Sequence, residues 1–168
     1  IDNALDAGAE EIDCALRSGG LDEIRVTDNG LGMTREELEA CFLPHATSKI
    51  TNAEDIYRVS TLGFRGEALG SIAACTRVEV ISRPSDDLSG KPSTAHRLEI
   101  CFGEPEGIAP ARGKPGTTVS ASNLFHTMPG RKKFLKSSRS ESGYCRSAFL
   151  DKALPFFSVR FRLFSDDS

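Results

Sequence analysis

The stretch Asp28-Asn29-Gly30-Leu31-Gly32-Met33 is the most informative part of this sequence. It follows residues 23–27, whose composition predicts a strand, so Asp28 ends that strand and opens a glycine-rich turn. Residues 1–9 (IDNALDAGA) stand before it and residues 63–69 (GFRGEAL) stand after it. Each string is common by itself, whereas the three in this order point to a single site.

Asp28 is suited to recognising an amino group. A buried carboxylate that accepts a hydrogen bond discriminates against ligands without a donor, because an unpaired buried acceptor costs about 1–3 kcal/mol. The alternative is that Asp28 only caps its own loop as an Asx-turn residue.

The end of the 63–69 motif is suited to binding phosphate. Gly66 comes directly before a helix predicted for residues 67–74, and the free N–H groups at a helix start bind phosphates well. Arg65 adds a positive charge beside them. Lys49 is a second candidate phosphate contact, with a solvated loop lysine as the alternative.

Asn3 is a candidate magnesium ligand. On a helix over residues 1–9, closed near Gly8, Asn3 shares a face with Asp6 and Ala7, because spacings of three and four residues bring side chains together. A carboxamide oxygen suits a hard cation such as Mg²⁺, which also bridges substrate phosphates. A surface asparagine without a ligand is the alternative.

The composition is that of an ordinary globular protein, with 168 residues of which 39% are hydrophobic. The net charge of −3 gives no overall attraction to nucleic acid, so any DNA contact must come from a local patch. No apolar run reaches the roughly 20 residues that span a membrane. Five scattered cysteines without a C-x-x-C pair favour reduced thiols in a cytoplasm. We therefore expect a cytoplasmic protein, nucleoid-associated if bacterial, with no membrane partner.

The remaining elements are predicted from periodicity and turn residues. A helix is expected from the Thr34 cap to about residue 42, because acids fill its first turn. The segments 84–94 and 104–115 hold most of the proline, glycine and serine and are predicted to be hairpin loops. Residues 43–65 are polar and are expected to be the most mobile internal segment. Further strands are expected over 11–16, 77–82, 95–101, 117–121 and 158–164, and a further helix over 138–153.

The three motifs, together with Gly116-Thr117-Thr118, resemble the nucleotide site of the gyrase, histidine kinase and MutL ATPase superfamily. The amino-acid sequence of residues 63–69, together with Thr47-Ser48-Lys49 and residues 129–135 (PGRKKFL), resembles specifically the corresponding motifs of the MutL family of DNA mismatch-repair proteins. The resemblance covers nearly the whole chain and implies ATP and Mg²⁺ as cofactors. It also implies an α/β two-layer sandwich, in which helices cover one face of a mixed, mostly antiparallel sheet.

The resemblance assigns a role to each matching residue. Asn3 would hold the magnesium, Asp28 would read the adenine amine with Thr117 nearby, and residues 63–69 would form the lid over the triphosphate. The full implied nucleotide-binding set is Asn3, Asp6, Ala7, Asp28, Gly30, Gly32, Met33, Thr47, Ser48, Lys49, Leu62, Gly63, Phe64, Arg65, Gly66, Glu67, Ala68, Leu69 and Thr117.

In that family a glutamate one helical turn before the magnesium-holding asparagine is the general base. That place lies upstream of Ile1, and Asp2 points to a different face from Asn3, so we expect no catalytic residue in the chain. The full-length protein would be an ATPase, whereas these 168 residues alone are expected not to turn over ATP. Residues 1–168 are expected to be one ATP-binding subdomain, incomplete at its N-terminus and lacking the transducer domain that follows.

The resemblance implies three partners for the full protein: a mismatch-recognition protein of the MutS type, a second copy through the N-terminal domain, and DNA bound mostly without sequence preference. The basic cluster of Arg131, Lys132, Lys133, Lys136 and Arg139 either contacts DNA phosphates or is a solvated helix face near the nucleotide loop. Two other functions stay open, namely a nucleotide-sensing scaffold that never hydrolyses and the ATPase domain of a type II topoisomerase or histidine kinase. Against the latter, residues 64–69 and 124–129 do not look like glycine-rich lids.

Overall fold

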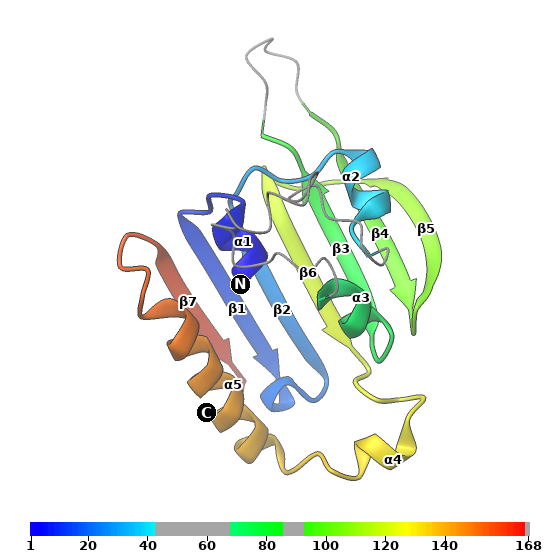
Figure 1. The fold of residues 1–168 in the computed structure, drawn as a ribbon, viewed down its shortest axis with the longest axis vertical. Coiled ribbons are helices and arrows are strands. Elements are labelled where there is room, and N and C mark those ends of the chain that lie inside the picture. Colours follow the sequence, from blue (N-terminus) through cyan, green and yellow to red (C-terminus); the bar gives the residue numbers. More distant parts are fainter. Residues whose placement is uncertain (43–67, 86–92, 167–168) are drawn as a thin grey trace, which may run out of the picture.

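The computed structural model describes residues 1–42, 68–85 and 93–166. Its centre is a seven-stranded sheet in the order β5-β4-β3-β6-β2-β1-β7 (Figure 1). Neighbouring strands are antiparallel except for β1 and β7, which are parallel. The strands are β1 (Glu11–Arg17), β2 (Glu23–Asp28), β3 (Arg77–Arg83), β4 (Ala95–Cys101), β5 (Glu104–Ala111), β6 (Gly116–Ser122) and β7 (Arg160–Ser165).

Short helices connect these strands, and one longer helix precedes β7. The helix α2 begins where the sequence predicts, because Thr34 and Glu37 form a capping box. The Thr34 hydroxyl accepts from the Glu37 N–H at 3.2 Å, and the Glu37 carboxylate accepts from the Thr34 N–H at 2.8 Å. The helices are α1 (Asp2–Asp6), α2 (Arg35–Ala40), α3 (Ala68–Ala73), α4 (Pro129–Lys132) and α5 (Ser138–Ala153), with a 3₁₀ turn η1 (Ser18–Gly20).

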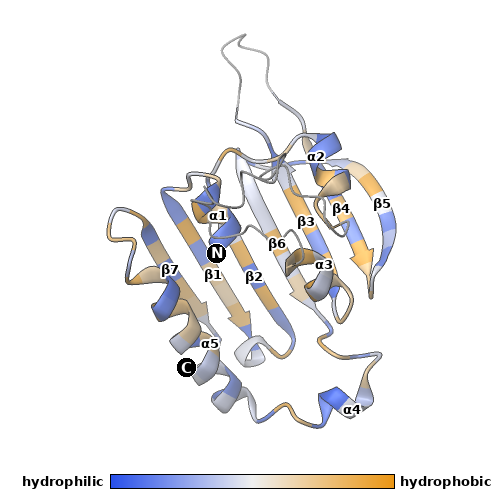
Figure 2. Cartoon of the chain, viewed as in Figure 1, coloured by the Kyte–Doolittle hydropathy of each residue, from blue (hydrophilic) through white to orange (hydrophobic). Residues whose placement is uncertain are grey.

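One face of the sheet carries the core. Along β1, Ile12, Cys14 and Leu16 are buried and alternate with residues that are half-buried or exposed, as the period of a strand requires (Figure 2). The other face is charged and solvated, which antiparallel sheets allow. There Arg162 on β7 donates to Asp13 on β1 at 2.6 Å.

The helices pack onto the core face in separate clusters. Helices α2 and α3 cover β3 and β4, helix α1 covers the start of β1, and helix α5 places Phe149 against Cys14 and Leu16. The rings of Phe149 and of Phe161 on β7 are in T-shaped contact, with 5.9 Å between ring centroids. This arrangement confirms the predicted two-layer sandwich with a mostly antiparallel sheet. The buried residues of the largest cluster are Leu38, Ala73, Val78, Val80, Leu98 and Ile100.

The prediction of a hairpin loop over residues 104–115 was wrong, because residues 104–111 form the edge strand β5. Pro105 and Pro110 suggested a loop, yet proline is tolerated in an edge strand, where one side of the backbone needs no partner. The pairing with β4 also contains a register shift between Glu99 and Ile100. The helix α4 was not predicted either. Residues 43–67 and 86–92, which include most of the other predicted loops, lie outside the described residues.

The five cysteines are free thiols. Burial raises the pKa of both Cys14 and Cys41 to about 11, so these thiols stay protonated near neutral pH. Within the part of the chain that the structure describes, no helix has the length and apolar character to cross a bilayer.

Candidate functional site

The ends of three strands meet at one end of the sheet. Asp28 ends β2, Gly116 begins β6, and the register of β3 with β6 pairs Ser82 with Thr117. Because β2 and β3 both flank β6, residues far apart in the sequence come together there. The structure thus brings two predicted site residues, Asp28 and Thr117, into direct contact.

One oxygen of the Asp28 carboxylate is held by two backbone N–H groups. Its Oδ1 accepts from Gly30 at 2.9 Å and from Thr117 at 3.2 Å. The bond from Gly30 is the one expected if Asp28 were only an Asx-turn residue that caps its own loop. The bond from Thr117 comes from another strand, so Asp28 also connects its loop to β6. Among the described residues nothing hydrogen-bonds to Oδ2, which leaves this oxygen as an acceptor for a ligand.

Burial raises the pKa of the Asp28 carboxyl, and the N–H groups of Gly30 and Thr117 oppose that rise. The cause is desolvation, which disfavours the charged form of a carboxylate away from water. A ligand that donates a hydrogen bond to Oδ2 would stabilise the charged form. The site therefore favours a donor such as an amino group.

Ser82 ties the Asp28 loop to the neighbouring strands. Its hydroxyl accepts from the Met33 N–H at 2.8 Å, lies 2.8 Å from the Thr117 hydroxyl, and lies 3.2 Å from the Gly116 carbonyl. The residue is fully buried, with 0% of its surface exposed. We did not predict Ser82 as a site residue. The signal in the sequence is a hydroxyl at the third core-facing position of β3, after Val78 and Val80.

Two glycines permit this close approach of backbones. Gly32 has φ +69°, and a Cβ there would lie 1.9 Å from the Arg83 carbonyl oxygen. Gly116 has φ +116°, and a Cβ there would lie 2.1 Å from the Asp28 carbonyl oxygen. The space at both positions is therefore taken up by contacts within the protein.

The helix α1 joins the same loop from the other side. The Ala7 carbonyl accepts from the Leu31 N–H at 3.0 Å, so the end of α1 is fixed beside the turn that Asp28 opens. Asn3 is exposed on α1, and Asp6 is half-buried and already engaged in an interaction. Among the described residues no group of three or more His, Cys, Asp or Glu side chains could hold a metal ion. The carboxamide oxygen of Asn3 is of the type that suits a hard cation such as Mg²⁺.

Most of the predicted phosphate lid lies outside the described residues. This applies to Thr47, Ser48 and Lys49, to Leu62, Gly63, Phe64, Arg65, Gly66 and Glu67, and to the expected mobility of residues 43–65. Only the last two lid residues are described. Ala68 begins α3, and Leu69 packs against the largest core cluster.

The basic cluster is remote from this site. Strand β6 runs from Gly116 beside Asp28 to Ser122 at the opposite end of the sheet, and α4 follows from there (Figure 1). The length of β6 therefore separates the cluster from Asp28. At that far end a hollow of about 470 Å³ is lined by residues that include Arg17 and Lys132.

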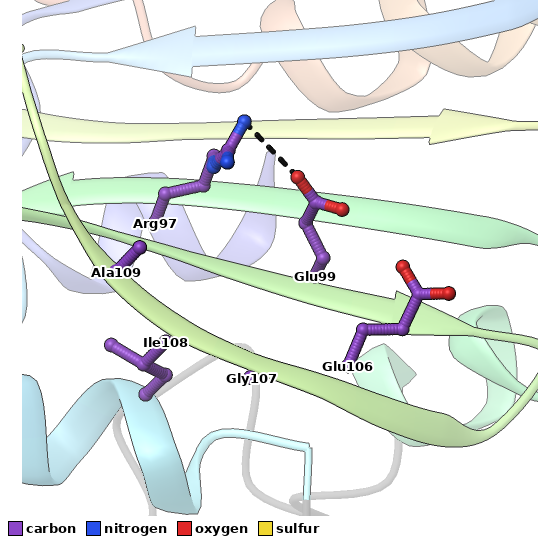
Figure 3. A pocket seen from close by; sticks show the side chains of 6 residues that line it. All are labelled: Arg97, Glu99, Glu106, Gly107, Ile108 and Ala109. Carbon is purple, nitrogen blue, oxygen red and sulfur yellow. Dashed lines mark ion pairs between the residues drawn. The ribbon is translucent and has the colours of Figure 1, made fainter.

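A smaller hollow of about 200 Å³ lies at the β4–β5 edge of the sheet, where Arg97 and Glu99 form an ion pair of 3.0 Å (Figure 3). Neither this hollow nor the larger one includes Asp28 or Thr117 among its lining residues. The paired charges of the smaller hollow are already satisfied by each other. The Asp28 end of the sheet remains the candidate site.

Comparison with known proteins identifies the fold. The family described as "Histidine kinase-, DNA gyrase B-, and HSP90-like ATPase" matches residues 1–100. The chain is 45% identical over 163 residues to the DNA mismatch repair protein MutL of Heliobacterium modesticaldum, covering 97% of this chain and 24% of the relative. It is 44% identical over 166 residues to the MutL of Acidiphilium cryptum, covering 99% of this chain and 28% of the relative. The chain thus spans about a quarter of the length of these relatives.

Solved structures agree with this match. The Aquifex aeolicus MutL ATPase domain complexed with ADP superposes with a TM-score of 0.71 and 25% identity, covering 98% of this chain and 56% of that one. The N-terminal domain of a DNA repair protein gives a TM-score of 0.75 and 31% identity, covering 98% of this chain and 45% of that one. The chain therefore belongs to the histidine kinase-, DNA gyrase B- and HSP90-like ATPase family, and within it is a MutL-like ATPase domain.

Proposed function

We propose that the chain is the ATP-binding part of a DNA mismatch-repair ATPase, in which Asp28 reads the exocyclic amine of adenine. The observation that carries this proposal is the fixed carboxylate. Two N–H groups hold Oδ1, and Oδ2 is left to accept from a donor. The amine of adenine supplies such a donor, whereas guanine carries a carbonyl at the same ring position. The Aquifex aeolicus relative, solved with ADP, supports an adenine nucleotide as the ligand.

The phosphates and the metal are assigned to the elements beside Asp28. We propose that Asn3 holds Mg²⁺ from the exposed side of α1, and that residues 63–69 cover the triphosphate as α3 begins. Bound Mg²⁺ would neutralise phosphate charge. The link between the Ala7 carbonyl and the Leu31 N–H supports this assignment, because it holds α1 beside the adenine loop.

For the whole protein we propose that ATP binding orders the lid and drives dimerisation, and that hydrolysis resets the cycle. Its partners would be a mismatch-recognition protein of the MutS type and DNA, both in the cytoplasm. We do not assign the general base to Asp2, whose carboxylate is paired with Lys152 on α5 at 2.8 Å. A glutamate one turn before Asn3 in the longer protein is the proposed base.

Calorimetric titration of the chain with ATP and GTP in the presence of Mg²⁺ tests the proposal. We expect ATP to bind and GTP to bind at least about tenfold more weakly, because guanine would leave Oδ2 of Asp28 without a donor. Equal affinities for the two nucleotides would overturn the adenine assignment. Absence of binding by both would overturn the proposed function of the chain.

Asn3→Ala is expected to weaken the binding of Mg²⁺-ATP by about tenfold, equivalent to roughly 1.4 kcal/mol, because the cation loses its protein ligand. The affinity for adenosine, which has no phosphate and needs no metal, should stay unchanged. Calorimetry with and without Mg²⁺ measures both quantities. If the variant gains as much affinity from Mg²⁺ as the unchanged chain does, Asn3 is not the ligand.

A further inference from the structure

We propose that Asn29 is a positioning residue that fixes the helix α1, and with it Asn3, relative to Asp28. Asn29 directly follows Asp28, and its side chain holds the start of β1, the strand that follows α1. In this proposal Asn29 links the binding of Mg²⁺ and phosphate to the binding of adenine. The inference rests on the proposed function, because it takes Asn3 as the magnesium ligand and Asp28 as the adenine contact.

The side chain of Asn29 closes the connection between α1 and β1. Its Oδ1 accepts from the backbone N–H of Glu10 at 2.9 Å and from that of Glu11 at 2.8 Å. Both partners are donors, so the oxygen of the carboxamide, and not its nitrogen, faces them. The Asn29 N–H also donates to the Glu11 carbonyl at 3.3 Å, which extends the pairing of β2 with β1. Asn29 is therefore joined to the residues after α1 by its side chain and its backbone.

Only a short stretch of chain separates these bonds from the helix. The chain leaves α1, turns at Gly8 with φ +69° and enters β1. Leu31 holds the same stretch, because its N–H donates to the Ala7 carbonyl at 3.0 Å. The end of α1 is thus tied to the loop of residues 28–33 at two points, and the contact of Asn29 is the one that depends on a side chain.

The other contacts of α1 do not fix its position along the sheet. Ala4 is buried in a cluster with Ile12, and the burial of apolar surface has no preferred direction. The ion pair of Asp2 with Lys152 at 2.8 Å joins two partly exposed side chains, and such pairs contribute little. Hydrogen bonds have a narrow range of length and angle. The bonds of Asn29 therefore help to set where α1 lies.

Metal binding is more sensitive to this position than adenine binding. Mg²⁺ needs its ligands at about 2.0–2.1 Å in near-ideal octahedral geometry, so a small displacement of α1 takes the Asn3 oxygen out of reach. Asp28 keeps its bonds from Gly30 and Thr117 when α1 moves, because neither residue belongs to α1. Loss of the Asn29 side chain should therefore weaken the metal contact and spare the adenine contact.

Asn29→Ala should leave the chain folded, because Asn29 is exposed and water can replace its oxygen at the N–H groups of Glu10 and Glu11. In NMR experiments without any ligand, we expect these two amides to exchange faster with solvent than in the unchanged chain. Asn29→Asp keeps an accepting oxygen and should restore slow exchange. Equal exchange in the unchanged chain and in Asn29→Ala would overturn the inference, because Asn29 would then not hold this connection.

Calorimetry measures the effect on ligand binding. Asn29→Ala is expected to weaken the binding of Mg²⁺-ATP by about fivefold and to change the affinity for adenosine by less than about twofold. In the Asn3→Ala chain the same substitution should cost less than about twofold for Mg²⁺-ATP, since the ligand that Asn29 positions is already absent. An equal loss in both backgrounds, or an equal loss for adenosine, would indicate a general role in loop stability and would overturn the inference.

Asn123→Ala is the matched control. Asn123 is an exposed asparagine at the opposite end of the sheet, and its loss should leave the ratio of the Mg²⁺-ATP and adenosine affinities unaltered. If the unchanged chain binds no ATP, the proposed function fails and this inference fails with it. If Asn3→Ala does not weaken Mg²⁺-ATP binding, the metal assignment and this inference fail together. If Asn3→Ala weakens it and Asn29→Ala does not, this inference alone is contradicted.

Discussion

Gly32→Ala is expected to lower the free energy of unfolding by more than about 3 kcal/mol and to abolish ATP binding. An alanine Cβ at this position would lie 1.9 Å from the Arg83 carbonyl oxygen, which belongs to the backbone and cannot rotate away. The loop would have to leave β3, taking with it the bond from Met33 to Ser82. Urea unfolding followed by circular dichroism measures the loss. Domains are typically stable by only about 5–15 kcal/mol, so the effect should be large.

Gly8→Ala is the matched control for this variant. Gly8 has the same φ of +69°, but a Cβ there would meet no atom within 4 Å. Its cost should be only the strain of a left-handed residue, about 1–2 kcal/mol. If the two variants were equally stable, close contact with Arg83 would not be the reason for a glycine at residue 32.

Asp28→Asn is expected to weaken ATP binding by more than about tenfold and to leave the fold intact, because an unsatisfied buried group costs about 1–3 kcal/mol. The amide oxygen can keep the two bonds from Gly30 and Thr117, which forces the NH₂ group into the place of Oδ2. A donor would then face the amine of adenine. The comparison is calorimetric, with Asp151→Asn on the exposed surface of α5 as the control. Binding within twofold of the unchanged chain would contradict the role of Asp28.

Burial of Asp28 also makes the stability of the chain depend on pH. Its pKa is raised in the folded state by desolvation, so between the ordinary value of about 3.9 and the raised value the native chain holds more protons than the unfolded chain. Stability therefore falls as pH rises through this window and stays lowered above it. Asp28→Asn removes the penalty and should have a higher Tm at pH 7 than the unchanged chain. A lower Tm at pH 7 would show that the charged carboxylate stabilises the fold.

Local signals in the sequence predicted most of the fold. The alternation of apolar residues along β1 and the capping box of Thr34 and Glu37 depend on neighbours in the chain, and both are confirmed. The strand β5 was missed because Pro105 and Pro110 suit a loop and an edge strand equally well. Only its pairing with β4 decides between the two, and that pairing is tertiary.

The sequence predicted which residues belong to the candidate site, but it did not predict the hydrogen bonds that join them. The motif placed Asp28 at the end of a strand, and the resemblance named Thr117. The bond between these two residues spans 89 positions of sequence and depends on the register of β2, β6 and β3, which no local pattern specifies. Ser82 was missed for the same reason. Its role follows from three partners that come from other segments of the chain.

The parallel pairing of β1 with β7 affects how the chain folds during synthesis. Glu11 on β1 and its partner Arg160 on β7 are separated by 149 positions. At about 5–20 residues per second, a ribosome needs roughly 7–30 s to deliver the second strand. Until then the outer edge of β1 has unpaired N–H and C=O groups, a template on which other nascent chains can aggregate. The charged residues Glu11, Asp13 and Arg17 lie along that edge strand. Their charges disfavour pairing of β1 with another chain until β7 has been synthesised.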